Sequence, residues 1–271
     1  MEILEIQKVD LTSFCYLNKG RYPFLLESVN HNENNRYSIL FAFPGDNIVL
    51  KNFSDFDFLK ELQDKSKSTI LDSELPFIGG WFVYLSYELI GQIESTLASK
   101  LHKSTLPIAY AVQVPSAIIV DHKLDKTFII DQDNNQSRIN SILSDIKLLN
   151  KTPTQRIKGS QSEEVENKFI DGVKSSLDYI VAGDVFQVNL SRKWQYQLTE
   201  TTDSAIIYNA LKKANPAPFS ALIQYENFSI ISSSPERLFS VNDKTLETRP
   251  IAGTHPRGKG DLDKTQKNNL I

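Results

Sequence analysis

The most regular helical pattern of the chain lies between residues 160 and 183. Ser160 and Glu163 have the spacing of a capping box, and Gly183 is a typical residue for a helix end. Between them every fourth residue is apolar, which predicts a helix over 160–182 that packs on a sheet through one face. That face carries Phe169, Val173, Leu177 and Val181.

Three further segments show helical spacing. Residues 53–63 have it with a high density of phenylalanine, residues 139–146 have it between two polar loops, and residues 205–214 have it up to Asn215-Pro216. The polar loops at 131–136 and 151–156 indicate a boundary near residue 150. We therefore expect an N-terminal region over 1–150 and a second domain that begins at 151 and continues to 271.

The remaining apolar pattern is mostly that of short strands joined by turns. The expected strands are residues 37–43, 109–120, 127–131, 185–191, 219–224, 228–232, 237–241 and 246–250. No regular alternation of strands and helices appears, so the pattern predicts an α+β protein with antiparallel sheets packed face to face and helices outside. The stretch 261–271 begins like a helix and reaches the last residue without a cap, so we expect a fold that is truncated at its C-terminus.

Composition narrows the class of protein. The 271 residues carry a formal net charge of −3, which argues against a nucleic-acid or anionic-membrane partner. The first residues are acidic where a signal peptide is basic, and no apolar run approaches the roughly 18 residues of a membrane span, so we expect a cytoplasmic protein. Cys15 is the only cysteine, and the four histidines are far apart, which leaves carboxylates as the ligands for any metal.

Glu236 is the first candidate for chemistry. It follows Ser234-Pro235 between two expected strands, where a held carboxylate can act as a general acid or base. The alternative is an exposed turn residue paired with Arg237, and the pattern alone favours this alternative.

Other polar residues lie on expected strands and turns. Thr254 follows a Pro-x-x-Gly turn and can donate to a substrate oxygen, although an ordinary strand exit is equally compatible. Arg249 and Arg257 are candidate carboxylate clamps. Gln187, Asn189 and Ser191 alternate on one strand face, which lines either a pocket or solvent.

Seven blocks, taken together and in order, resemble the chorismate-utilising enzymes, and specifically the large subunits of aminodeoxychorismate synthase and of the related anthranilate synthase. The blocks are residues 22–28, 36–40, 79–88, 183–191, 215–219, 234–237 and 248–254. They are distributed over essentially the whole chain, and each block alone is only weak evidence for the family.

The resemblance implies an enzyme in which ammonia, delivered by a glutamine amidotransferase subunit, replaces an oxygen of chorismate. It implies proton transfer by Glu236, with Thr254 also at the catalytic centre, and a pocket that holds tryptophan. On this chain that pocket corresponds to Ser28, Asn34, Asn35, Arg36, Tyr37, Pro218, Phe219 and Ser220.

Two departures from the family pattern affect the expected chemistry. Ala252 stands where well-known aminodeoxychorismate synthases have a lysine nucleophile, which is the anthranilate synthase pattern. The family also continues beyond this chain with a region that supplies the acidic Mg²⁺ ligands. We therefore expect no metal ligands within this chain and an incomplete site in the chain alone.

Three functions remain open. Blocks such as residues 187–190 and 106–109 favour the aminodeoxychorismate synthase component, which makes 4-amino-4-deoxychorismate for 4-aminobenzoate and folate. The alternatives are anthranilate synthase component I, which serves tryptophan biosynthesis, and a non-catalytic remnant that only binds tryptophan.

Overall fold

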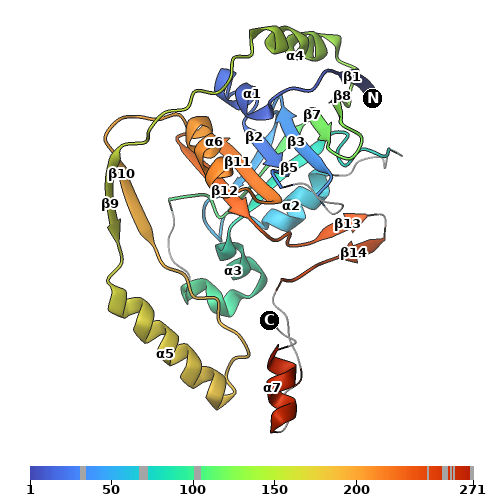
Figure 1. The fold of residues 1–271 in the computed structure, drawn as a ribbon. Helices are drawn as coiled ribbons and strands as arrows, with labels where there is room; N and C mark the ends of the chain where they lie inside the picture. Colours follow the sequence, from blue (N-terminus) through green and yellow to red (C-terminus); the bar gives the residue numbers. More distant parts are fainter. Residues whose placement is uncertain are drawn as a thin grey trace. The chain divides into compact units, whose positions relative to one another are not determined.

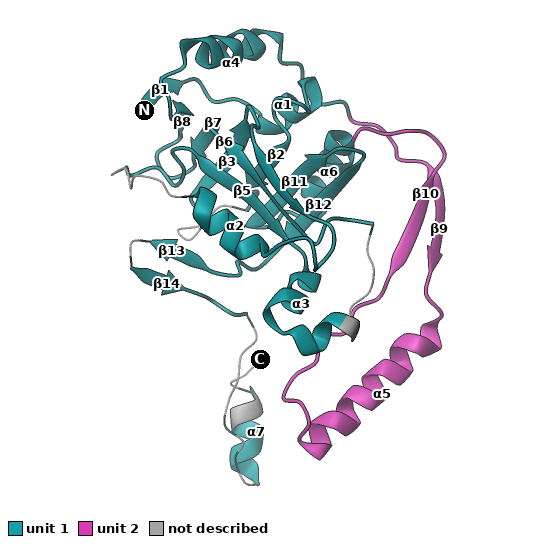
Figure 2. Cartoon of the chain, turned by 180° about the vertical axis from the view of Figure 1, so that it is seen from behind, with its two compact units in different colours: residues 1–153, 204–271 teal, residues 154–203 magenta. Residues whose placement is uncertain are grey.

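The chain forms two compact units. The computed structural model describes residues 1–30, 35–66, 73–100, 105–242, 244–251, 256, 258 and 260–268. Residues 1–153 and 204–271 make up unit 1, and residues 154–203 make up unit 2 (Figure 2). Residues 151–271, which the sequence analysis assigns to one domain, therefore contribute to both units.

A seven-stranded antiparallel sheet is the centre of unit 1 (Figure 1). Its strands, in spatial order, are β1 (Glu2–Ile6), β8 (Lys126–Asp131), β7 (Ser116–Asp121), β3 (Tyr37–Ala42), β2 (Phe24–Glu27), β11 (Phe219–Tyr225) and β12 (Phe228–Ser234). Every residue of β7 is buried, because both faces of the sheet are covered.

A smaller sheet packs against one face of the large sheet. It consists of β4 (Asn47–Leu50), β6 (Ala109–Val114) and β5 (Gly80–Leu85). Aromatic side chains fill the interface: the rings of Phe24 and Phe82 stack with centroids 4.2 Å apart, and Tyr110 stacks on Tyr225 at 4.6 Å. These contacts join the two sheets through one apolar layer.

Helices cover the outer faces of both sheets. Side chains from α1 (Leu11–Leu17), α4 (Gln136–Leu148) and α6 (Ser204–Ala214) share a core with the large sheet. Phe58 of α2 (Phe58–Lys65) packs on the small sheet with Leu89. The short helical segments η1 (Tyr87–Leu89), α3 (Ile90–Ile93) and η2 (Ser95–Lys100) follow β5. The predicted α+β class, with face-to-face antiparallel sheets and outer helices, is confirmed.

Local signals explain where several elements begin and end. The helix expected over 53–63 begins only at Phe58, because the side chain of Asp57 accepts a hydrogen bond from the Lys60 amide. The run 109–120, expected as one strand, divides at Pro115 into β6 and β7, which belong to different sheets. A proline has no N–H for the ladder and suits this change of sheet.

Unit 2 differs from the sequence predictions in two places. Ser160 and Glu163 lie in β9 (Gly159–Glu163), so the expected capping box is wrong; α5 (Glu166–Ala182) begins after Val165 without a side-chain cap. The strand expected over 185–191 is also wrong, because this segment is irregular and the partner of β9 is β10 (Trp194–Leu198). Gly183 ends α5 with φ 83°, as predicted.

Within unit 2, the apolar face of α5 that the sequence predicts to pack on a sheet is exposed. Val173 is 38% exposed, Leu177 57% and Val181 88%. At the end of the chain, β13 (Ser240–Asn242) and β14 (Thr245–Glu247) pair as a hairpin, and α7 (Asp261–Asn268) follows. Among the described residues, no helix combines the length and the apolar character that a membrane crossing needs.

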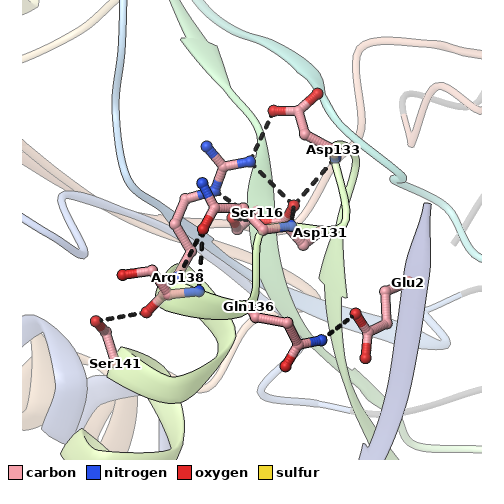
Figure 3. Close-up of polar contacts among 9 residues, drawn as sticks. Glu2, Ser116, Asp131, Asp133, Gln136, Arg138 and Ser141 are labelled. Atoms are coloured by element: carbon pink, nitrogen blue, oxygen red, sulfur yellow. Dashed lines mark hydrogen bonds and ion pairs between the residues drawn. The ribbon is translucent and has the colours of Figure 1, made fainter.

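A buried aspartate joins the large sheet to α4 (Figure 3). Asp131, at the end of β8, accepts hydrogen bonds from Arg138 Nε at 2.6 Å, from Ser116 Oγ at 2.6 Å and from the Asn135 amide at 2.9 Å. Burial raises the pKa of Asp131, but the hydrogen bonds from Arg138, Asn135 and Ser116 outweigh it and leave the pKa lowered. The buried Asp131 carboxylate therefore stays ionised only while its hydrogen-bond donors are in place.

We expect Arg138→Met to lower the free energy of unfolding by about 3–5 kcal/mol, because it leaves the Asp131 charge buried without its guanidinium. Lys126→Met is the matched control. It removes an exposed ion pair with Glu5 between β8 and β1, and should cost less than about 1 kcal/mol. Urea denaturation followed by circular dichroism measures both values. Equal losses in the two variants would contradict the role assigned to Asp131.

Candidate functional site

A cavity of about 460 Å³ lies in unit 1 where several strands of the large sheet begin or end. Its walls are formed by Leu26, Glu27, Ser28, Asn35, Arg36, Tyr37, Ile39, Pro218, Phe219, Ser220 and Arg237. We call it the strand-end pocket. It contains every residue predicted to bind tryptophan except Asn34, which lies outside the described residues.

Strand pairing brings these distant segments together. Leu26 of β2 pairs with Ile39 of β3, and Glu27 of β2 pairs with Ser220 of β11. The pocket therefore forms where β2 ends and where β3 and β11 begin. Beyond the ladder, the Val29 amide donates to the Ala217 carbonyl at 3.1 Å, which continues the link between these segments.

Ser28 has a structural role in this wall. Its amide donates to Ser38 Oγ at 3.0 Å, and its own hydroxyl donates to the Tyr37 carbonyl at 2.9 Å. Ser38 Oγ also lies 2.7 Å from Nε2 of His122. This chain of hydrogen bonds fixes the turn after β2 against the start of β3.

The guanidinium of Arg36 is engaged by a buried carboxylate. Arg36 Nε donates to both oxygens of Asp121, at 2.9 and 3.0 Å, and Nη2 donates to Oδ2 at 2.5 Å. Asp121 is 1% exposed; burial raises its pKa, but the hydrogen bond from Arg36 and those from two backbone amides leave the pKa lowered. Arg36 thus contributes to the pocket wall with its charge neutralised.

Glu27 is the pocket's acidic side chain, and it too is neutralised. Tyr208 donates its hydroxyl proton to Glu27 Oε2 at 2.6 Å, and Lys212 Nζ donates to both carboxylate oxygens at 3.2 Å. Lys212 also donates to Thr12 at 2.7 Å. Burial and the Glu27 charge raise the pKa of Tyr208, so its hydroxyl remains a donor. The group connects the pocket to α1 and α6.

Arg237 is the remaining charged residue of the pocket. Its guanidinium lies over the Phe219 ring, 5.8 Å from the centroid, and its Nη2 is 3.8 Å from Glu247 Oε2. Nε of Arg249 donates a hydrogen bond to Oε1, the other carboxylate oxygen of Glu247. Two arginines therefore share one carboxylate. The ion pair that the structure shows for Arg237 is with Glu247, whereas the sequence analysis considers a pair with Glu236.

Glu236 lies directly beside the pocket wall and is exposed. Its amide donates to Ser234 Oγ at 3.3 Å, and Ser234 Oγ donates to the Glu236 carbonyl at 3.0 Å. The backbone is thus held while the carboxylate remains accessible, as general acid–base chemistry requires. Thr254, the Ala252 position and Arg257 lie outside the described residues.

The remaining polar candidates lie elsewhere. Gln187, Asn189 and Ser191 belong to unit 2, where they are exposed on an irregular segment and do not share a strand face; Gln187 Nε2 donates to Asn189 Oδ1 at 3.4 Å. Within the described part of the chain, no group of three or more histidine, cysteine, aspartate or glutamate side chains could hold a metal ion.

Sequence reasoning missed the polar partners behind the pocket. Tyr208 and Lys212 share one face of α6, but nothing in that spacing connects them to Glu27, which lies far away in the chain. Arg237 appears only as a partner of Glu236. The pocket has apolar surfaces from Leu26, Ile39 and Phe219 beside charged groups, and this suits a small molecule with a flat apolar body and a charged end.

The chain is similar to known proteins over most of its length. A family model described as chorismate binding enzyme matches residues 21–271. Anthranilate synthase component 1 of Lactococcus lactis subsp. lactis is 27% identical over 270 residues, which cover 90% of this chain and 59% of the relative. Aminodeoxychorismate synthase component 1 of Bacillus subtilis is 32% identical over 221 residues, which cover 76% of this chain and 47% of the relative.

The fold also matches a solved structure. Anthranilate synthase component I from Streptococcus pneumoniae TIGR4 superposes with a TM-score of 0.70 at 24% identity, over 89% of this chain and 57% of that chain. The present chain thus spans between about half and three-fifths of the length of these relatives.

We expect Lys212→Met to lower the free energy of unfolding by about 1.5–3 kcal/mol, because it removes hydrogen bonds to the charged Glu27 in a partly buried site. Lys213→Met is the matched control on the exposed side of the same helix and should leave stability nearly unchanged. Urea denaturation of both variants measures the difference. An unchanged midpoint in Lys212→Met would show that Glu27 does not depend on this cation.

Proposed function

The chain belongs to the chorismate-binding enzyme family, and from this premise we propose that it forms part of the chorismate-converting component of an ammonia-dependent synthase. The observation that carries the proposal is that residues separated in the sequence converge on the strand-end pocket, beside the backbone that holds Glu236. The resemblance assigns Ser28, residues 35–37 and residues 218–220 of this pocket to tryptophan binding, and Glu236 to proton transfer.

Anthranilate is the product that we propose for the complete enzyme. Motifs in the sequence favour the folate branch, but the comparisons support the alternative better. The L. lactis relative, matched over 90% of this chain, is named anthranilate synthase component 1. Ala252 agrees with this branch, because an alanine has no nucleophile to form a covalent adduct. The second candidate is aminodeoxychorismate formation, which the B. subtilis relative and the blocks at 187–190 and 106–109 support.

Glu236 is the proton-transferring residue in this proposal. Ammonia attacks the chorismate ring directly, and the ring hydroxyl that leaves takes a proton from a carboxylic acid and departs as water. Formation of anthranilate then requires loss of the enolpyruvyl side chain as pyruvate. The accessible side chain of Glu236 on a held backbone supports this role. Thr254 is proposed as a hydrogen-bond donor to substrate, on the resemblance alone.

The proposed partners follow from the same reaction. Ammonia comes from a glutamine amidotransferase subunit, and the reaction takes place in the cytoplasm. Mg²⁺ is proposed as the cofactor, held by acidic residues other than those that the structure describes, because these do not provide a ligand set.

Tryptophan is the ligand proposed for the strand-end pocket. A volume of about 460 Å³ lies within the usual range for small-molecule sites. The rings of Tyr37 and Phe219 and the side chain of Leu26 offer surfaces for an indole, while charged and hydroxyl groups are available to its polar end. A non-catalytic tryptophan-binding role uses this same pocket, so catalysis needs its own test.

We expect Glu236→Gln to slow chorismate amination by about 10²–10⁴-fold, because the amide cannot transfer the proton. The assay supplies chorismate, Mg²⁺ and ammonium, and complements the chain in trans with the unmatched C-terminal portion of the L. lactis or the B. subtilis relative. Glu226→Gln, in the exposed turn between β11 and β12, is the control. Chromatography identifies the product; anthranilate with both donor portions supports the proposed branch.

Two outcomes of that assay contradict the proposal. Full activity of Glu236→Gln would remove Glu236 from the mechanism. Aminodeoxychorismate as the product with both donor portions would replace anthranilate with the second candidate.

We expect Leu26→Trp to abolish tryptophan binding, because the larger side chain fills the pocket. Leu26 is half-exposed, so the variant should fold. Leu59→Trp introduces the same residue at a similarly exposed position of α2, away from the pocket, and should bind normally. Isothermal titration calorimetry with L-tryptophan compares the three proteins. Absence of binding to the unaltered chain would overturn the assignment of the ligand.

A further inference from the structure

One wall of the strand-end pocket is supported by a buried hydroxyl. Ser38, in β3, is 1% exposed, and its Oγ accepts a hydrogen bond from the Ser28 amide at 3.0 Å. The Ser28 hydroxyl in turn donates to the Tyr37 carbonyl at 2.9 Å. Ser28 and Tyr37 line the pocket, and Ser38 supports them without lining it.

The Ser38 hydroxyl has one proton to donate, and the structure offers one acceptor for it. Nε2 of His122 lies 2.7 Å from Ser38 Oγ, and among the described residues Oγ has no partner besides this nitrogen and the Ser28 amide. Because the amide can only donate, it uses a lone pair of Oγ, and the hydroxyl proton points to Nε2. A proton on Nε2 would leave the buried hydroxyl without an acceptor, which is costly. The ring proton of His122 therefore lies on Nδ1.

The imidazole is presented by a turn that is itself held. His122 follows β7, and its amide donates to the Arg36 carbonyl at 2.9 Å. The preceding residue, Asp121, binds the Arg36 guanidinium. The backbone of His122 thus contacts the residue before β3, while its side chain contacts Ser38 within β3. His122 holds this segment at two points, on either side of the pocket residue Tyr37.

We propose that His122 is a positioning residue of the strand-end pocket, whose Nε2 accepts from Ser38 and so keeps Ser28 and Tyr37 in the geometry that binds the ligand. Without this acceptor the buried Ser38 hydroxyl must turn to find another, and the Ser28 amide loses a fixed partner. The inference rests on the proposed tryptophan pocket, and it adds a residue that lies outside the lining of that pocket.

Three substitutions test the role in binding. His122→Leu removes the acceptor and should weaken L-tryptophan binding about five- to tenfold. His122→Gln supplies an amide oxygen that can accept from Ser38, and its affinity should return to within about twofold of that of the unaltered chain. Lys123→Leu makes the same apolar substitution at the exposed next residue of the turn and should bind normally. Isothermal titration calorimetry compares the four proteins.

A double-variant cycle tests whether His122 acts through Ser38. Ser38→Ala removes the hydroxyl, so in that background His122→Leu should weaken tryptophan binding little further. Two measurements need no ligand. Nitrogen NMR of the histidine rings should find the proton of His122 on Nδ1. Hydrogen exchange measured by mass spectrometry should be faster at the Ser28 amide in His122→Leu and slow again in His122→Gln.

The outcomes separate this inference from the ligand assignment. If the unaltered chain binds tryptophan and His122→Leu binds it equally well, the positioning role is wrong and the pocket stands. The role is also wrong if His122→Gln binds as weakly as His122→Leu, if the losses in the cycle add, or if Nε2 carries the proton. If the unaltered chain does not bind tryptophan but exchange at Ser28 responds as expected, the ligand assignment fails and the support of the wall by His122 stands.

Discussion

The bond between Asp121 and Arg36 is the interaction on which the strand-end pocket depends. The large sheet is covered on both faces, so a charge at the end of β7 needs a partner at close range. Asp121 accepts from the Arg36 guanidinium and from the amides of Lys123 and Leu124, which fixes the turn after β7 and the segment before β3 together. The Arg36 carbonyl accepts from the His122 amide at 2.9 Å and continues this link. These hydrogen bonds therefore hold the pocket wall rigidly against the sheet.

The elements that were predicted most accurately from the sequence are those that local sequence patterns determine. The helices of unit 1 at 139–146 and 205–214 are present because apolar residues at helical spacing face the large sheet. The hairpins at 219–232 and 237–250 follow from short apolar runs separated by turn residues, although β13 and β14 are shorter than expected. The pocket residues were found only through the resemblance, since no periodic pattern relates Ser28 to Pro218.

Other features depend on contacts that no local pattern contains. Ser160 and Glu163 have the spacing of a capping box, yet pairing with β10 extends this segment as β9. Alternation over 185–191 indicates a strand, but a strand also needs a neighbour, and β9 is paired with β10 instead. The bonds from Lys212 and Tyr208 to Glu27 join α6 to β2 across most of the chain, so they appear only once the sheet has formed.

The order of strands in the large sheet has a consequence for folding during synthesis. β2 pairs with β3 on one side and with β11 on the other, but β11 leaves the ribosome only after unit 2 has been made. Until then β2 is an open edge of the nascent sheet, and its later pairing with β11 closes a very long loop, which slows folding. β11 thus adds its side of the strand-end pocket late in synthesis. The nascent chain forms the complete pocket only when β11 pairs with β2.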